Sequence, residues 1–157
     1  MNVSIEVEDE AWAELAGLEE LTRGAVDAAL KGAGVDGNGL DIAILFTGDL
    51  SIAVINAEWR GKDYPTNVLT FPTAPDMPVP DGEPRPLGDI VLASGVVARE
   101  AVEQGKTLRA HATHLIVHGV LHLLGHDHED EVEADAMERL ETEILKGLGI
   151  SDPYERQ

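Results

Sequence analysis

A helix expected over about 107–124 constrains the fold most, because apolar side chains surround it almost completely. Leucine, isoleucine and valine fill most of its circumference, and a single row of histidines interrupts them. Such a helix belongs inside the molecule, where other elements cover it. At 157 residues the chain can build one hydrophobic core without disulfides, and it has no cysteine to form them.

The rest of the chain alternates strand-like and helical segments. Alternating or continuous apolar residues predict strands over 3–7, 40–47, 67–71 and 88–94. Helices are expected over 10–31, 50–59, 95–104, 107–124 and 131–147, with Asp49 and Ser94 as N-caps. The segment 72–86 holds six of the eight prolines and predicts a long loop. These elements predict one α+β domain over 1–157, a small mixed β-sheet covered by about five helices.

The formal net charge of −19 is distributed unevenly. Residues 60–109 contain six basic and seven acidic residues, a net charge of −1, which leaves −18 for the remainder. Proteins that grip nucleic acid over a broad face are normally basic. The middle segment is therefore the part of this chain that a polyanion can approach without strong repulsion.

The sequence gives no sign of secretion or of membrane insertion. Residues 1–12 lack a basic region followed by an apolar run. No stretch approaches the roughly 18 uninterrupted apolar residues of a membrane span. We therefore expect a soluble cytoplasmic protein with no membrane partner.

Four histidines form a stripe along the buried helix. At 100° per residue, His111, His114, His118 and His122 fall within about 80° of one another. A buried imidazole without a partner costs roughly 1–3 kcal/mol, and one shared metal ion satisfies several at once. We expect His111 and His114 to be hydrogen-bonded core or pocket residues rather than ligands.

The string HGVLHLLGHDH, residues 118–128, predicts a metal site. His118 and His122 lie one turn apart, and Gly125 allows the chain to turn back so that His128 supplies a third ligand. The spacing is that of the metzincin pattern H-E-x-x-H-x-x-G-x-x-H. Three nitrogen ligands leave a fourth position for water, which is typical of a catalytic site holding one Zn²⁺ ion.

Three further positions near this string bear on its chemistry. His126 competes with His128 for the third ligand position, and Asp127 either orients a ligand or is exposed. Gly119 stands where zincin proteases carry the glutamate that acts as general base. Peptide hydrolysis by the zincin route is therefore not expected, and no general base is identified.

Together with RGKDYPTNVLTFP (60–72) and LGDIVLAS (87–94), the histidine string resembles the YbeY family of bacterial rRNA maturation factors. The three motifs occur in order across about 40–145. The resemblance implies an α+β metalloprotein and a single-strand-specific endoribonuclease. It also implies a role in 16S rRNA 3′-end maturation and late ribosome quality control in the cytoplasm. Implied partners are single-stranded rRNA, the small ribosomal subunit and the GTPase Era.

By position, the resemblance assigns the zinc ligands to His118, His122 and His128, and an essential arginine to Arg60. The family often has tyrosine where this chain has His126. As a hypothesis, Arg60 binds a phosphate and stabilises charge in the transition state. The alternative role for Arg60 is an ordinary surface ion pair with a neighbour such as Asp63.

Two other functions stay open. One is a ribosome-associated assembly factor whose zinc is mainly structural, which the missing glutamate favours and the open coordination position disfavours. The other is an unusual metallopeptidase, which would need a base from elsewhere in the chain.

Overall fold

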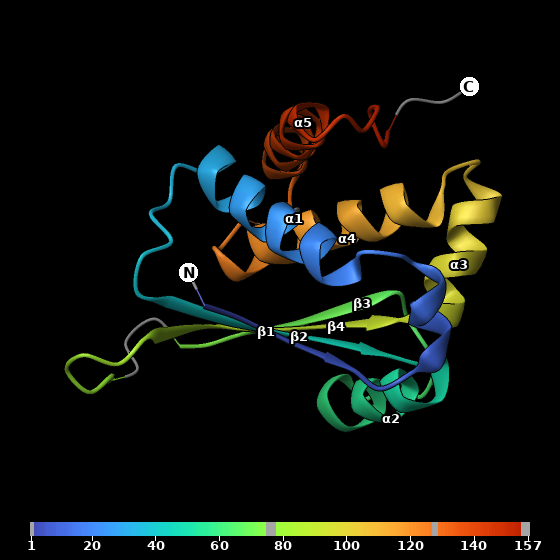
Figure 1. Ribbon diagram of the computed structural model, residues 1–157, viewed down its shortest axis with the longest axis horizontal. Helices are drawn as coiled ribbons and strands as arrows, with labels where there is room; N and C mark the ends of the chain where they lie inside the picture. The colour runs from blue at the N-terminus through green and yellow to red at the C-terminus, as the bar shows by residue number, and fades with distance from the viewer. Residues whose placement is uncertain (1, 75–77, 127–128, 155–157) are drawn as a thin grey trace.

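The computed structural model describes residues 2–74, 78–126 and 129–154 (Figure 1). Its strands are β1 (Asn2–Val7), β2 (Leu40–Thr47), β3 (Val68–Pro72) and β4 (Arg85–Ala93). Its helices are the 3₁₀ helix η1 (Glu10–Glu14), α1 (Leu18–Gly32), α2 (Asp49–Arg60), α3 (Ser94–Glu103), α4 (Leu108–Leu123) and α5 (Glu131–Gly147). The four strands form one sheet in the order β1-β2-β4-β3. β3 is antiparallel to β4 and the other pairs are parallel, which confirms the predicted α+β class with a mixed sheet.

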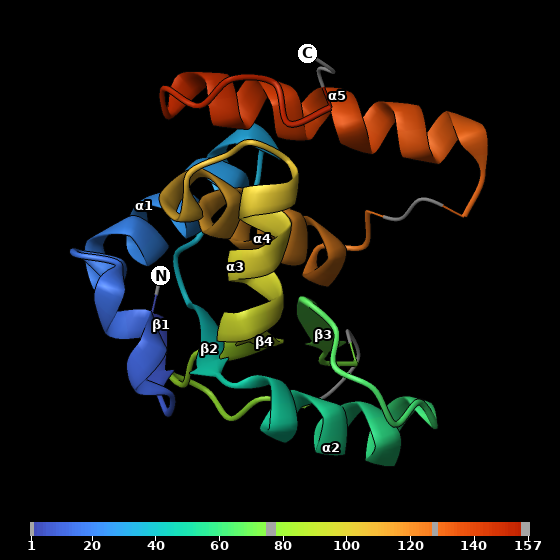
Figure 2. The ribbon, with the colours of Figure 1, turned by 90° about the vertical axis from the view of Figure 1, so that its right-hand side faces the viewer.

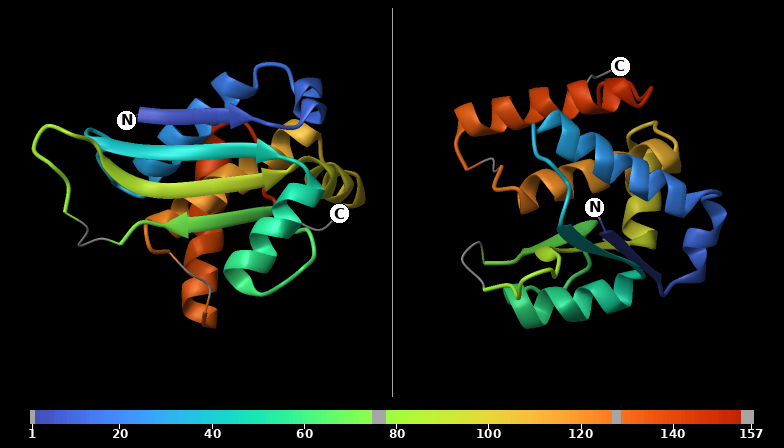
Figure 3. Two further views of the ribbon diagram at one scale, coloured as in Figure 1. Left: turned by 90° about the horizontal axis from the view of Figure 1, so that it is seen from below. Right: turned by 60° about the vertical axis from the view of Figure 1, so that its left-hand side comes forward.

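The helices cover the two faces of the sheet unequally. α1 and α4 lie on one face with α5 outside them, and α2 lies on the opposite face (Figures 1 and 2). From below, α2 crosses one end of the sheet (Figure 3). α4 packs against α1, α3, α5 and both β3 and β4, and most of its residues are buried. The prediction of a central buried helix is therefore confirmed.

Alternate residues of the central strands point into two separate apolar clusters. Ile42 and Ile44 of β2, with Ile90 and Leu92 of β4, belong to the large core shared with α1 and α4. Val91 belongs to a small cluster under α2. This alternation follows from the pleat of a strand, which sends successive side chains to opposite faces. No helix among the described residues combines the length and apolar character needed to cross a membrane.

The expected helix over 10–31 is two elements. η1 ends before Gly17, whose φ of 71° places it in the left-handed region, and α1 begins after it. Glycine adopts this conformation without the steric cost that a Cβ brings. The proline-rich loop is also shorter than expected, because β3 extends to Pro72 and β4 begins at Arg85. Pro86 is tolerated there because β3 pairs with β4 only from Gly88 onward.

The two expected N-caps have other roles. Gly48 occupies the cap position of α2 and Ala93 that of α3. Asp49 instead accepts a hydrogen bond from the backbone N–H of Val96 at 3.0 Å, so its side chain caps the neighbouring helix α3. The hydroxyl of Ser94 donates to the carboxylate of Asp9 at 2.7 Å.

Candidate metal centre

The histidines of α4 form the predicted row. Successive ring centroids are 6.3 Å apart for His111 and His114, 6.2 Å for His114 and His118, and 4.5 Å for His118 and His122. His111 and His114 are buried, whereas His118 and His122 are partly exposed. The row therefore runs from the interior of the molecule toward solvent, and its accessible end is the His118–His122 pair.

His118 and His122 direct the same ring atom toward a shared point. The two Nε2 atoms are 3.0 Å apart. Two nitrogens bound tetrahedrally to one zinc at about 2.0–2.1 Å lie roughly 3.3 Å from each other, so the pair needs only a small adjustment to share an ion. Gly125, with φ 96°, ends the helix directly after this pair, as the sequence predicted. The residues present fit a metal ion.

The third predicted ligand, His128, lies outside the described residues, as does Asp127. The assignment of His128 therefore stays a prediction. His126 is half-buried, and its backbone N–H donates to the carbonyl of Leu121 at 3.0 Å, which closes the end of α4.

A second group with metal-ligand chemistry adjoins the first. Glu141 of α5 is fully buried and accepts hydrogen bonds from Nδ1 of His118, from Nε2 of His114 at 3.2 Å, and from the hydroxyl of Tyr154. Ligand atoms of His114, His118 and Glu141 lie within 4.8 Å of one another, so this His/His/Glu cluster could also hold a metal. The two arrangements share His118, whose Nδ1 contacts Glu141 and whose Nε2 contacts His122.

The surroundings of Glu141 favour its ionised form. Burial by itself raises the pKa of the Glu141 carboxyl, but hydrogen bonds from His114, His118 and Tyr154 and the charge of His118 outweigh it and lower the pKa to about 2. Burial and the hydrogen bond to Glu141 raise the pKa of the Tyr154 hydroxyl. Glu141 is therefore a carboxylate and Tyr154 a neutral donor at neutral pH.

His111 has its own carboxylate partner. Its Nε2 lies 2.9 Å from Oε1 of Glu100, which also accepts from the side-chain amide of Asn67 at 3.0 Å. Burial lowers the pKa of His111, and the hydrogen bond to Glu100 opposes this effect. His111 is therefore the hydrogen-bonded core residue that the sequence predicted. His114 is hydrogen-bonded as predicted too, although it belongs to the possible His/His/Glu metal cluster.

Sequence reasoning missed Glu141, Glu100 and Tyr154. A signal for Glu141 was present, because it shares the inward face of α5 with Met137, Ile144 and Leu145, at helical spacing. An acidic residue on an apolar stripe of a helix usually has a buried partner. The abundance of acidic residues in α5 hid this position.

The surroundings of Gly119 disfavour the zincin glutamate at this position. Gly119 is buried, and a Cβ added there would lie 3.0 Å from Cδ1 and 3.2 Å from Cγ2 of Ile90. The position therefore faces the sheet, and a long charged side chain there would require Ile90 to move.

Arg60, the last residue of α2, is exposed and donates through Nη2 to the carbonyl of Thr70 in β3 at 3.3 Å. Among the described residues it forms no ion pair with Asp63. α4 packs against β3 as well, from the face of the sheet opposite α2 (Figure 2). Within the part of the chain that the structure describes, Thr70 is the one hydrogen-bond partner of the Arg60 side chain, so most of its guanidinium donors are available to another ligand.

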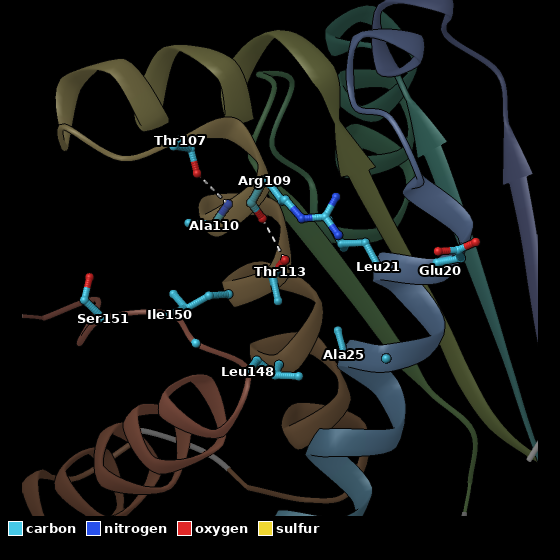
Figure 4. Close-up of a pocket in the computed structure, with 12 residues that line it drawn as sticks. Glu20, Leu21, Ala25, Thr107, Arg109, Ala110, Thr113, Leu148, Ile150 and Ser151 are labelled. Carbon is cyan, nitrogen blue, oxygen red and sulfur yellow. Dashed lines mark hydrogen bonds between the residues drawn. The ribbon is translucent and has the colours of Figure 1, made fainter.

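Two cavities border α4. One of about 330 Å³ opens beside His118 and is lined also by His111, His114, Lys106 and Tyr154. The other, of about 500 Å³, lies between α1, α4 and the segment after α5 (Figure 4).

Three polar side chains of the larger cavity form hydrogen bonds that serve the fold. Thr107 accepts from the backbone N–H of Ala110, and Thr113 donates to the carbonyl of Arg109. The guanidinium of Arg109 donates to the carbonyl of Ala16 at 3.1 Å. The smaller cavity, next to His118, is the one associated with the candidate metal centre.

Known proteins resemble this chain over nearly its whole length. The family model for Endoribonuclease YbeY matches residues 4–149. Endoribonuclease YbeY of a Chelativorans species is 53% identical over 139 residues, which covers 87% of this chain and 85% of the relative. Endoribonuclease YbeY of Allorhizobium ampelinum is 48% identical, covering 100% of this chain and 96% of the relative. The solution structure of TM1509 from Thermotoga maritima covers 98% of this chain and 99% of its own, with a TM-score of 0.58 and 25% identity. The chain therefore belongs to the YbeY family.

Proposed function

We propose that this protein is a zinc-dependent endoribonuclease that cleaves single-stranded RNA, and that its substrate is the 3′ region of 16S rRNA during maturation and late ribosome quality control. The observation that supports this most directly is the pair of Nε2 atoms, on His118 and His122, that face each other 3.0 Å apart in a YbeY-family chain. His128 completes a three-nitrogen ligand set in this proposal.

The residues divide into a metal-holding group and a phosphate-binding group. His118, His122 and His128 hold one Zn²⁺ ion, which when bound supplies Lewis-acid chemistry at a phosphoryl oxygen. Arg60 binds the phosphate through its planar fork of N–H donors and stabilises the charge that develops on it. The hydrogen bond from Arg60 to Thr70 supports this role, since it holds the guanidinium at the edge strand against which α4 packs.

The deciding experiment is cleavage of a single-stranded RNA oligonucleotide by highly purified protein. The variants His118→Ala and His122→Ala are prepared in parallel, and metal content is measured for each. We expect both variants to lose the ion and the activity together. Equal residual cleavage by the wild type and by both variants would identify a contaminating nuclease and remove the enzyme proposal.

One observation favours the second candidate, an assembly factor with a mainly structural zinc. The position of the zincin base is filled by Gly119, which packs against Ile90. For this candidate, removal of zinc should lower the unfolding midpoint and ribosome association, and pure protein should not cut RNA at any zinc concentration.

The partners follow from the same proposal. A substrate within 16S rRNA implies contact with single-stranded rRNA and with the small ribosomal subunit, in the cytoplasm. The GTPase Era is proposed as a further partner on the family resemblance. Co-sedimentation of the protein with small subunits, with and without Era, tests both associations.

A further inference from the structure

We propose that Glu141 is a positioning residue, which fixes the tautomer of His118 so that Nε2 of this ring presents its lone pair to the metal. The inference rests on the proposed zinc site but concerns a residue that does not bind the ion. Glu141 lies on α5. Its carboxylate contacts Nδ1 of His118, whereas Nε2 of the same ring faces His122.

The first step is the hydrogen-bond chemistry of a carboxylate. An ionised carboxylate only accepts hydrogen bonds, so each ring nitrogen that faces it must carry a hydrogen. Glu141 faces Nδ1 of His118. The imidazole that binds a metal is neutral and has one ring hydrogen, so placing this hydrogen on Nδ1 leaves Nε2 unprotonated. That nitrogen is the one that lies 3.0 Å from Nε2 of His122.

The second step is that Glu141 is itself held in place. Its side chain is 0% exposed, and it also accepts from His114 and from the hydroxyl of Tyr154. Among the described residues, the buried Nδ1 of His114 has no hydrogen-bond partner. Leaving a buried lone pair unpaired costs less than leaving a buried N–H unpaired. The tautomer of His114 with its hydrogen on Nε2, which faces Glu141, is therefore favoured. Together, His114 and His118 of α4 and Tyr154 donate three hydrogen bonds, which hold the Glu141 carboxylate in one orientation.

The third step separates this role from direct coordination. Oε1 of Glu141 accepts directly from His118, and Oε2 accepts from His114 and Tyr154. Both oxygens are thus engaged with donors, so in this role Glu141 contacts the ring of His118 and not the ion. Carboxylates that orient a metal-bound histidine in this way raise its basicity, and their loss typically weakens metal binding about 10–100-fold.

The test compares two buried histidine–carboxylate pairs on the same helix. Zinc affinity is measured by competition with a chromophoric chelator for the wild type, Glu141→Gln and the matched control Glu100→Gln. The control changes the carboxylate partner of His111, which is not a proposed ligand. We expect Glu141→Gln to weaken zinc binding about 10–100-fold and Glu100→Gln to leave it within about threefold. Unchanged affinity in a folded Glu141→Gln protein would overturn the proposal.

A second measurement needs no variant. Imidazole ¹⁵N shifts of the full-length wild type are recorded before and after addition of zinc. We expect His118 to carry its hydrogen on Nδ1 in both states, and a hydrogen on Nε2 in the metal-free protein would overturn the proposal.

Direct coordination by Glu141 predicts a different set of affinities. In that case His122→Ala would keep full zinc affinity, while His114→Ala and Glu141→Gln would abolish binding. Absence of RNA cleavage by the zinc-loaded wild type would instead remove the proposed function and leave the role of Glu141 intact.

Discussion

At Gly119, the backbone of α4 lies against the side chain of Ile90 in β4, and this contact limits the chemistry of the site. In zincins, the residue after the first histidine is the general base. Here that position faces the sheet instead of solvent. A side chain at Gly119 must displace Ile90, which is fully buried in the main core.

We therefore predict that Gly119→Glu lowers the free energy of unfolding by about 1–3 kcal/mol or more, because it overpacks the core and buries a charge. Urea denaturation measures the loss. Gly147→Glu is the matched control, since a Cβ at this helical glycine meets no atom of the described residues within 4 Å. The interpretation fails if Gly119→Glu is as stable as the control or gains peptidase activity.

Arg60 is the one proposed catalytic side chain, and its hydrogen bond to Thr70 does not involve the histidines. We predict that Arg60→Ala lowers turnover of a single-stranded RNA substrate about 10²–10³-fold, the usual effect of removing a transition-state donor. Zinc content should stay at the wild-type level. Loss of zinc together with activity would show that Arg60 supports the fold of the site instead.

At the scale of elements, β2 and β4 bring two acidic residues together. Burial raises the pKa of the Asp89 carboxyl, and the nearby Asp41 raises it further. Because the folded protein then binds this proton more tightly than the unfolded chain, stability falls as pH rises through the folded pKa of Asp89.

We predict that Asp89→Asn raises the free energy of unfolding at pH 7. The gain should be under about 1 kcal/mol, because solvent screens exposed charges. It should vanish as the pH falls below the ordinary range of aspartate pKa values, where Asp89 is protonated in both states. Urea midpoints at pH 7 and near pH 3 check this, and an equal gain at both pH values would contradict it.

Most elements could be predicted from the sequence, because local patterns determine them. The periodic apolar residues of 107–124 and 131–147 predicted α4 and α5, and Gly125 predicted the end of α4. The role of Asp49 could not be predicted, since its carboxylate caps a helix 47 residues away. Local sequence does not encode contacts of that range.

The candidate site was likewise predictable only in part. The spacing of His118 and His122 places them on one turn of a helix, and the structure shows their rings together. Glu141 lies 23 residues beyond His118 and reaches it only because α5 folds back over α4. The pairing of a buried acid with a particular histidine is a tertiary contact, which helical periodicity alone cannot specify.

At the scale of the whole molecule, the net charge of −19 opposes the approach of a polyanion. Salt screens such long-range repulsion, with a Debye length of about 10 Å at 0.1 M. We predict that raising monovalent salt from about 25 to 150 mM does not lower kcat/KM on single-stranded RNA. A steep fall, as for proteins that neutralise many phosphates, would contradict this and indicate a broad basic RNA path.

The central claim is that Nε2 of His118 and Nε2 of His122 bind one ion together with His128. Anomalous diffraction at the zinc edge, from crystals of zinc-loaded protein, tests it most directly. The account predicts one zinc bound by these three histidines, with solvent in the remaining position and with Glu141 hydrogen-bonded to Nδ1 of His118. Zinc bound between His114, Nδ1 of His118 and Glu141, or a fourth protein ligand closing the shell, would contradict it.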